Sequence, residues 1–424
     1  MKSCYRIHLA ALVLALVASV ASAAPLTEID YLKSHSRDVG ADGAALAFDR
    51  DFYRKRLFVL GEVHGIAAGQ PLDLAILRHL NSRAGVRVYV AEVDVAQAAR
   101  FNAYLADGDQ RHLQTVFADW TAEDAQWGNQ DFFNKIVSVR RLNQSLRESR
   151  RIRFVGADQL QNPALAREFL TGLMTGLELS GWPEGVAFRQ RLVGEDPAPT
   201  VRAMIADLQA VRASMPADAP RGIPQTRWRE LRVALVSLAG APRQGREDRI
   251  TANIERLFDE PAMRGQKAYG LWGLFHVIQA RVSGASPLAY RLGRSGGPLA
   301  GQVGSILTVA LNSQMMMPSA ALPAFARGKG RYVDMPYTMD NEKAVLLNGI
   351  GPISATAKAR TTLVRLDGDR SPYPGSDLLT RTSGFYARSQ PFQIEGGTAA
   401  AGGAVNYLLV VRDSPATRPL KAVP

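Results

Sequence analysis

The sequence predicts an α/β fold with a central, mostly parallel or mixed sheet. The first observation is a strand, a helix and a second strand within residues 57–91, which is the length of one βαβ unit. The two strands of such a unit lie parallel and are joined by a right-handed crossover. The second observation is that later apolar runs, at residues 152–155 and 268–272, again follow helical patterns. This alternation indicates a sheet with helices packed against it.

The βαβ unit is the clearest element. Residues 57–60 form a short apolar run that stops at Gly61, and apolar residues then recur at helical spacing through residues 72–80 before Gly85. Residues 86–91 form the next apolar run. Because the two strands are parallel, we expect both to end at the same edge of the sheet.

The middle of the chain is predicted to be mainly helical. Residues 95–151 have a helical pattern with many aromatic side chains, which is more typical of a core than of a ligand site. The strand at residues 152–155 ends in Gly156-Ala157-Asp158-Gln159, so Asp158 joins the same sheet edge. Residues 162–245 alternate helical stretches with Pro and Gly breaks, and we expect a helical cap or insertion over the site there.

The last part of the chain supplies the remaining strands. A helix over residues 246–258 precedes the strand at residues 268–272. Three more runs are predicted to be strands, at residues 303–311, 361–366 and 407–411. Between residues 320 and 402, the Gly, Pro and Ser content suggests long loops, some of which would line a pocket.

Residues 1–23 have the layout of a secretory signal peptide. Lys2 and Arg6 precede an apolar stretch over residues 9–20, and the small residues 21–23 form a cleavage site. The stretch is shorter than the roughly 20 residues that cross a bilayer. We therefore expect cleavage, no stable membrane insertion afterwards, and a periplasmic or secreted protein. A retained N-terminal anchor is the alternative.

Composition excludes several classes of protein. The only cysteine is Cys4, inside the leader, so the exported chain has no cysteine nucleophile, disulfide or Cys-type zinc site. The chain carries 51 Lys and Arg against 39 Asp and Glu, a net charge of +12, which favours anionic surfaces or ligands. The basic residues are scattered without interleaved aromatics, so we infer solvated helical faces and no nucleic-acid binding. Those on the helical faces include Arg140, Arg141, Arg147, Arg150, Arg151 and Arg153.

Side chains suited to acid-base chemistry stand at the strand ends. Glu62 and His64 follow the first strand, Glu92 closes the second, and His276 follows the strand at residues 268–272. Ligands of open α/β sheets bind beyond the carboxyl edge of the strands, so we expect these four residues to form one site. The other mature histidines are expected at the surface: His35, His79 and His112.

These residue types allow two kinds of chemistry. His64 would act as the general base that activates water, oriented by Glu92 or Glu62. His276 would donate to the oxygen that becomes negative. Alternatively, His64, Glu92 and His276 would hold a divalent metal, with open positions for water. No Gly-x-Ser-x-Gly elbow, Walker loop or His-Glu-x-x-His helix is present. These absences argue against a serine esterase and against a thermolysin-like peptidase.

At these residues the sequence resembles the erythromycin esterase-like family, within the wider group that holds ChaN-like haem-binding lipoproteins and the Tiki/TraB proteins. The resemblance covers most of the mature chain in order. It runs through Leu60-Gly61-Glu62-Val63-His64-Gly65, Glu92, residues 140–143, Gly156-Ala157-Asp158-Gln159, Arg246-Glu247-Asp248-Arg249, Asn253, the strand before His276, and residues 407–412.

The resemblance implies a three-layer α/β/α architecture and hydrolysis of an ester, in the antibiotic esterases a macrolide lactone, by a histidine-activated water. Carried over by motif, His64 is the base and Glu62, Glu92 and His276 complete the site. Arg246 is implied as a binding or structural residue, and Asp158, which ends a strand at the same edge, is a further binding candidate. The late segment has the Gly-x-x-His form of Tiki-like proteins where the family usually has His-Asn.

We therefore expect residues 24–424 to form one erythromycin esterase-like domain with a helical insertion at about 162–245. The predicted protein is exported and hydrolyses a small-molecule ester or lactone. No cofactor is required by this prediction, and the sequence leaves open whether a divalent metal takes part. The alternatives are a non-catalytic haem- or metal-binding envelope protein, as in the ChaN-like branch, and a Tiki-like metal-dependent peptidase.

Overall fold

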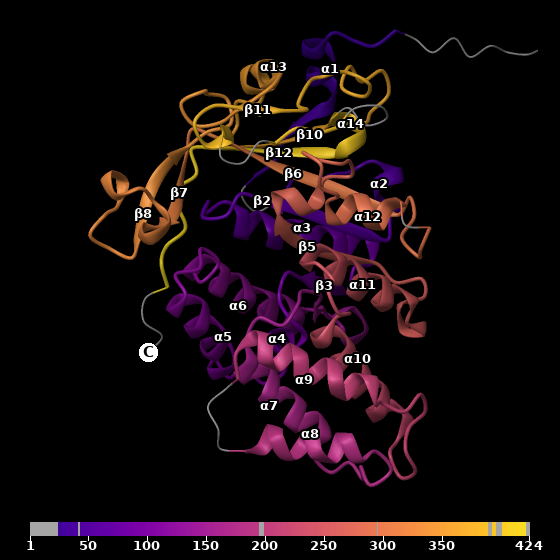
Figure 1. The fold of residues 1–424 in the computed structure, drawn as a ribbon. Coiled ribbons are helices and arrows are strands. Elements are labelled where there is room, and N and C mark those ends of the chain that lie inside the picture. The colour runs from indigo at the N-terminus through magenta and orange to yellow at the C-terminus, as the bar shows by residue number, and fades with distance from the viewer. Residues whose placement is uncertain are drawn as a thin grey trace, which may run out of the picture.

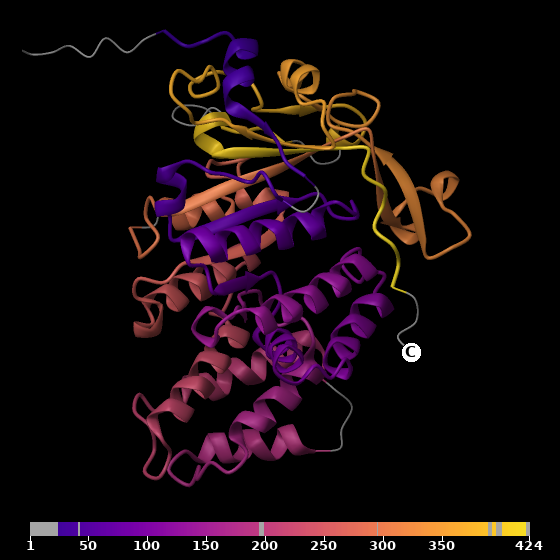
Figure 2. The ribbon, with the colours of Figure 1, turned by 180° about the vertical axis from the view of Figure 1, so that it is seen from behind.

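The computed structural model is an α/β/α sandwich (Figures 1 and 2), and it confirms the predicted fold class. It describes residues 24–40, 43–194, 199–294, 296–388, 392–395 and 401–420. The predicted leader, residues 1–23, lies outside the described residues. Among the residues that are described, no helix combines the length and the apolar character needed to cross a membrane.

The central sheet is mixed and mostly parallel. Its strands are β1 (Ser36–Asp38), β2 (Leu57–Glu62), β3 (Val88–Ala91), β4 (Arg153–Gly156), β5 (Ala268–Gly273), β6 (Val303–Leu311), β10 (Thr361–Arg365) and β12 (Tyr407–Arg412). Within the described residues their order is β1-β10-β12-β6-β2-β5-β3-β4. β10 runs antiparallel to both of its neighbours, and the pairs from β12 to β4 are all parallel. The carboxyl ends of β2, β3, β4 and β5 therefore share one edge.

Helices cover both faces of the sheet because successive strand side chains point to opposite sides. Phe58 and Leu60 of β2 belong to the core under one helical layer, and Leu57 and Val59 belong to the core under the other. The first layer contains α2 (Arg50–Arg54), α3 (Gly69–Ala84), α4 (Val95–Asp107), α5 (Arg111–Ala122) and α6 (Gln130–Ser145). The second contains α1 (Glu28–His35), α11 (Arg246–Asp259), α12 (Leu288–Arg294) and α13 (Ile350–Thr356).

The predicted helical insertion follows β4. It consists of α7 (Pro163–Met174), α8 (Pro183–Val193), α9 (Val201–Ala213) and α10 (Gln225–Ala239). Asn162 caps α7 by accepting from the backbone N–H of Leu165 at 2.9 Å, and Trp182 and Trp228 meet edge to face in the core of the group. The group packs against α4 and extends the molecule beyond β3 and β4 (Figures 1 and 2).

The part of the chain expected to be mainly loops contains more structure than predicted. A hairpin of β7 (Ser313–Pro318) and β8 (Tyr332–Tyr337) projects from the end of the central sheet (Figure 1). A second small pair joins β9 (Leu346–Leu347) to β11 (Thr382–Ser383). The remaining short elements are α14 (Ala401–Ala404), η1 (Glu148–Arg150), η2 (Pro261–Met263), η3 (Leu274–Val277), η4 (Ser319–Ala321), η5 (Ala324–Ala326) and η6 (Tyr386–Arg388). The strands β7, β8, β9 and β11 pair outside the central sheet, so their sequences lack the clear apolar alternation of a core strand.

Candidate active site

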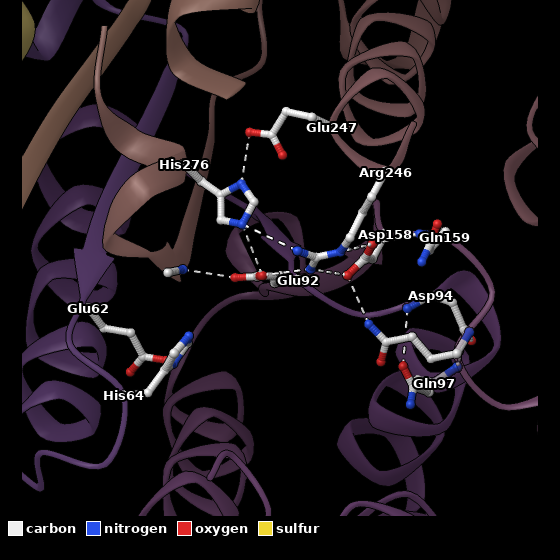
Figure 3. Close-up of polar contacts among 12 residues, drawn as sticks. Glu62, His64, Glu92, Asp94, Gln97, Asp158, Gln159, Arg246, Glu247 and His276 are labelled. Atoms are coloured by element: carbon white, nitrogen blue, oxygen red, sulfur yellow. Dashed lines mark hydrogen bonds and ion pairs between the residues drawn. The ribbon is translucent and has the colours of Figure 1, made fainter. Parts of the chain in front are cut away.

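The predicted residues meet at the carboxyl edge of the sheet. Glu62 ends β2 and lies in register with Gly273, which ends β5. Glu92 follows β3, and the short helix η3 returns His276 towards these strand ends. Figure 3 shows the side chains converging on this edge. The parallel order of the strands is what brings together residues that are far apart in the sequence.

His64 and Glu62 form one pair. Nδ1 of His64 lies 3.0 Å from Oε1 of Glu62, and Gln70 donates from Nε2 to the other carboxylate oxygen at 3.0 Å. Of the two carboxylates expected to orient His64, Glu62 is the one that contacts it. An Nδ1–H directed at Glu62 leaves Nε2 of His64 as an acceptor, which is the tautomer that a general base requires. The His64 side chain is 35% exposed, so water reaches it.

His276 is held by two carboxylates. Its Nδ1 lies 2.9 Å from Oε1 of Glu247, the second residue of α11, and its Nε2 lies 3.3 Å from Oε1 of Glu92. The other oxygen of Glu92 accepts the backbone N–H of Gly273 at 2.8 Å. With its side chain only 10% exposed, His276 is fixed between these carboxylates (Figure 3).

Arg246, the first residue of α11, completes the network. It donates from Nε and Nη2 to the two oxygens of Asp158, at 3.1 and 2.6 Å, and Nη2 also donates to Glu92 at 2.7 Å. Asp158 is fully buried, and Arg246 is the cation that contacts it. Such a two-pronged guanidinium–carboxylate contact fixes orientation as well as charge. Asp158 and Arg246 are the binding candidates named from the sequence. In the structure Asp158 fixes Arg246, and Arg246 holds Glu92 in place.

Two local features hold the strand ends close together. Asp94 caps α4, and its second carboxylate oxygen accepts the backbone N–H groups of Gln161 and Asn162, at 2.8 and 3.3 Å. This ties the exit of β3 to the exit of β4. A Cβ on Gly156 would lie 2.2 Å from the carbonyl oxygen of Asp94, so only glycine allows this approach.

The two histidines face each other across Gly273. A Cβ placed on Gly273 would lie 3.2 Å from Nε2 of His64 and 3.5 Å from Cδ2 of His276. The missing side chain of Gly273 thus leaves space between the two imidazoles. A water or a reacting group in that space would touch both rings.

A small cavity opens beside this pair. Its volume is about 70 Å³, enough for a few water molecules. Besides the site residues, its wall includes Trp120, Trp127, Phe132 and Lys135 of the α5–α6 region, and the rings of Trp127 and His64 are 5.8 Å apart. None of the described lining residues belongs to the insertion, so the aromatic α5–α6 region covers the site.

Neighbouring charges set the protonation of the two histidines. Burial alone would lower the pKa of His64, but the hydrogen bond with Glu62 and the Glu62 charge outweigh it, so this pKa is raised above its ordinary value. Burial would also lower the pKa of His276, yet Glu247 and Glu92 raise it to about 10. Nη1 of Arg246 lies 3.4 Å from Nε2 of His276, but two carboxylates outweigh one guanidinium, and His276 is an imidazolium at neutral pH.

The same side chains do not fit the metal alternative. Within the described residues, no three His, Cys, Asp or Glu side chains are arranged to hold a metal ion. The guanidinium of Arg246 contacts Glu92 and lies 3.4 Å from Nε2 of His276, so two of the three predicted metal ligands already face a positive charge.

Sequence reasoning missed several contributors. The sequence assigns no role to Glu247, although its position beside Arg246 at a helix start indicates a second polar residue at the same edge. No sequence pattern points to the Gly273 N–H, Gln70 or Lys135. The other histidines lie away from the site: His35 stacks on Tyr31, His79 bonds Tyr53, and His112 pairs with Asp107.

Comparison with known proteins identifies relatives of the fold. No family model matches the sequence, and no curated protein matches it. A mutant of the erythromycin esterase EreC in its open conformation is 14% identical, with 92% of this chain and 100% of that chain covered and a TM-score of 0.62. A succinoglycan biosynthesis protein is 10% identical at a TM-score of 0.64, and a Bacillus cereus protein is 12% identical at 0.62; each comparison covers 93% of this chain and 98% of the other.

At such identities the likeness shows the fold and not the activity. The fold expected from the resemblance is confirmed, while no particular member is indicated. ChaN of Campylobacter jejuni, described with cofacially bound haem, matches with a TM-score of only 0.25, which does not bear on this chain.

Proposed function

We propose that the protein is an exported esterase-like hydrolase that activates water with His64 and acts on a small-molecule ester or lactone. The observation that carries the proposal is the pair of unlike imidazoles on either side of Gly273. The His64 ring contacts one carboxylate and its side chain is one-third exposed, whereas the His276 ring is mostly buried between two carboxylates that raise its pKa to about 10. Two titratable groups whose environments separate their pKa values are suited to opposite roles in proton transfer.

In this proposal His64 handles the protons. Its Nε2 takes a proton from water while the water oxygen attacks the ester carbonyl carbon, and Glu62 stabilises the imidazolium that forms. When the tetrahedral intermediate collapses, the carbon–oxygen bond to the alcohol breaks. His64 then returns its proton to the alcohol oxygen, and the products are a carboxylic acid and an alcohol.

The charge that develops on the carbonyl oxygen would be stabilised by nearby positive charge. His276, held between Glu247 and Glu92, borders the space beside Gly273 through its Cδ2 edge. Arg246 adds a second positive group next to Nε2 of His276. Because nitrogens of both residues already contact carboxylates, they would stabilise the oxyanion through their positive charge rather than as hydrogen-bond donors.

A panel of aryl esters, alkyl esters and lactones tests the function directly. The wild-type protein, purified without its leader and treated with chelator, should hydrolyse at least one class of ester with saturation kinetics. Absence of hydrolysis across the panel, with and without added divalent metals, would exclude the proposed activity.

The pH dependence of hydrolysis should report both histidines. Because His64 must be neutral to accept a proton, kcat/KM should rise with pH through the raised pKa of His64. Because His276 must stay protonated, activity should fall again as the pH passes about 10. In Glu247→Gln one carboxylate beside His276 is lost, so the pKa of His276 falls and the alkaline limb should move to lower pH. An alkaline limb that stays in place in this variant would assign it to another group.

Gly273→Ala should reduce activity without unfolding the protein. The φ of Gly273 is −52°, which any residue adopts, so the backbone accepts alanine. The new methyl would press on His64 at 3.2 Å and fill the space between the rings, and we expect about a hundredfold lower kcat/KM. Gly172→Ala, in α7 with open space around its Cβ position, is the matched control. Wild-type kinetics in Gly273→Ala would mean that the reacting group lies elsewhere.

A further inference from the structure

A second and larger cavity adjoins the candidate site. It has a volume of about 410 Å³, within the range of about 300–1,000 Å³ that small-molecule sites occupy. Its walls come from four places: the start of α3, one side of α6, the start of β10, and the end of β12 with the residues that follow it. Apolar surface makes up most of the lining and includes Pro71, Leu74, Val411 and Pro415. The charged residues Asp131, Lys135, Arg360, Arg412 and Asp413 also belong to the walls.

The two cavities meet at Lys135. This α6 residue belongs to the walls of both, its side chain is 1% exposed, and it forms a buried ion pair with Asp73 of α3 at 2.8 Å. Its ammonium group also lies over the ring of Phe132 and donates to the hydroxyl of Tyr89 at 3.3 Å. A buried cation held by these partners has a fixed position, so it forms a wall shared by the larger cavity and the site.

Gln70 links the larger cavity to the catalytic pair. Its Nε2 donates to Glu62, which in turn contacts His64. The amide directs its nitrogen at Glu62 because its oxygen would repel the carboxylate in the reverse orientation. The other amide atom, Oε1, is buried and has no hydrogen-bond partner among the described residues, although Gln70 is only 3% exposed. A buried acceptor without a donor is destabilising, and a donor on a ligand would remove that cost.

We propose that this cavity is a subsite for the substrate, which takes a largely apolar group that carries a hydrogen-bond donor such as a hydroxyl. The apolar part would pack between Leu74 and Val411, and the donor would reach Oε1 of Gln70. The inference rests on the proposed function, because the reacting ester would lie next door at His64. The cavity next to His64 has a volume of only about 70 Å³, so the bulk of a substrate would bind beside it.

Filling the cavity tests the subsite. Ser138 on α6 lines it and uses its hydroxyl to bond the backbone carbonyl of Asn134, so Ser138→Phe directs a ring into the space without breaking a tertiary contact. Leu74→Trp fills it from α3 and serves if the first variant fails to fold. The matched control is Ser145→Phe on the same helix, where the serine likewise bonds a helix carbonyl but lies outside the cavity.

The substrates are 4-nitrophenyl acetate and 4-nitrophenyl octanoate. Ser138→Phe should lower kcat/KM for the octanoate at least about tenfold, because the octanoyl chain loses its apolar contacts with the cavity. The acetate should change less than about twofold, and Ser145→Phe should match the wild type with both esters. Equal loss with both esters, or no loss with the octanoate, would overturn the subsite.

A binding measurement separates this inference from the proposed function. By titration calorimetry, 1-octanol should bind the wild type about fivefold more tightly than 1-methoxyoctane, which cannot donate to Gln70. Ser138→Phe should weaken octanol binding and Ser145→Phe should not. If no ester is hydrolysed but octanol binding follows this pattern, the hydrolase proposal fails and the ligand site stands. Octanol binding that is absent, or unchanged by Ser138→Phe, would remove the site.

Discussion

His64→Ala should lose ester hydrolysis almost completely, with kcat lower by about 10²–10⁴-fold, the usual contribution of a general base. The variant keeps the fold because the His64 side chain is one-third exposed and its polar contact is the Glu62 carboxylate. Glu62 still accepts from Gln70 in the variant, so it is not left without a partner. The loss should therefore appear in kcat rather than in thermal stability.

The matched control for this change is His112→Ala. His112 also pairs with one carboxylate, Asp107, at 3.0 Å, but it lies on α5 away from the sheet edge. Its removal should leave hydrolysis unchanged. The kcat of Glu62→Gln should lie between those of His64→Ala and His112→Ala. The amide still hydrogen-bonds the His64 ring, but it no longer stabilises the imidazolium. Wild-type kcat in His64→Ala would assign the base to another residue and would leave His276 without its proposed counterpart.

The sheet-edge residues could be predicted because geometry, rather than contact detail, brings them together. Parallel strands end at one edge, so any polar residue that directly follows β2, β3 or β5 is placed there. That argument located Glu62, His64, Glu92 and His276, and the structure brings their side chains together. What the sequence left open was the pairing, since one-residue differences in a turn decide which carboxylate meets which imidazole.

Contacts made by helices were harder to predict. Glu247 reaches His276 only because of the angle at which α11 meets the sheet, and no periodicity in the sequence encodes that angle. Lys135 and Asp73 occupy positions that look like polar helix surface, yet α3 and α6 pack face to face and bury both. The covering of the site was similarly hidden: the insertion at residues 162–245 packs on α4, and the aromatic α5–α6 region lines the cavity.

Arg246→Gln should cause the largest loss of stability among single changes at the site. The Asp158 side chain is fully buried and accepts hydrogen bonds from two nitrogens of Arg246. Glu92 accepts a further hydrogen bond from Nη2 of the same arginine. Removing one partner of a buried ion pair costs about 3–5 kcal/mol, but the Arg246 side chain is 41% exposed, which lets water compensate in part. We expect the free energy of unfolding to fall by about 2–3 kcal/mol in urea denaturation.

Arg281→Gln provides the comparison because its ion pair with Glu395 lies at the surface, with side chains 48% and 39% exposed. A surface pair contributes about 0–1 kcal/mol, so this variant should denature nearly as the wild type does. The combined variant Arg246→Gln with Asp158→Asn should regain part of the stability, because a neutral amide is less costly to bury than an unpaired carboxylate. Equal urea midpoints for Arg246→Gln and Arg281→Gln would show that Asp158 finds compensation elsewhere. In that case the contacts of Glu92 with the Gly273 N–H and His276 would be enough to hold it in position without Arg246.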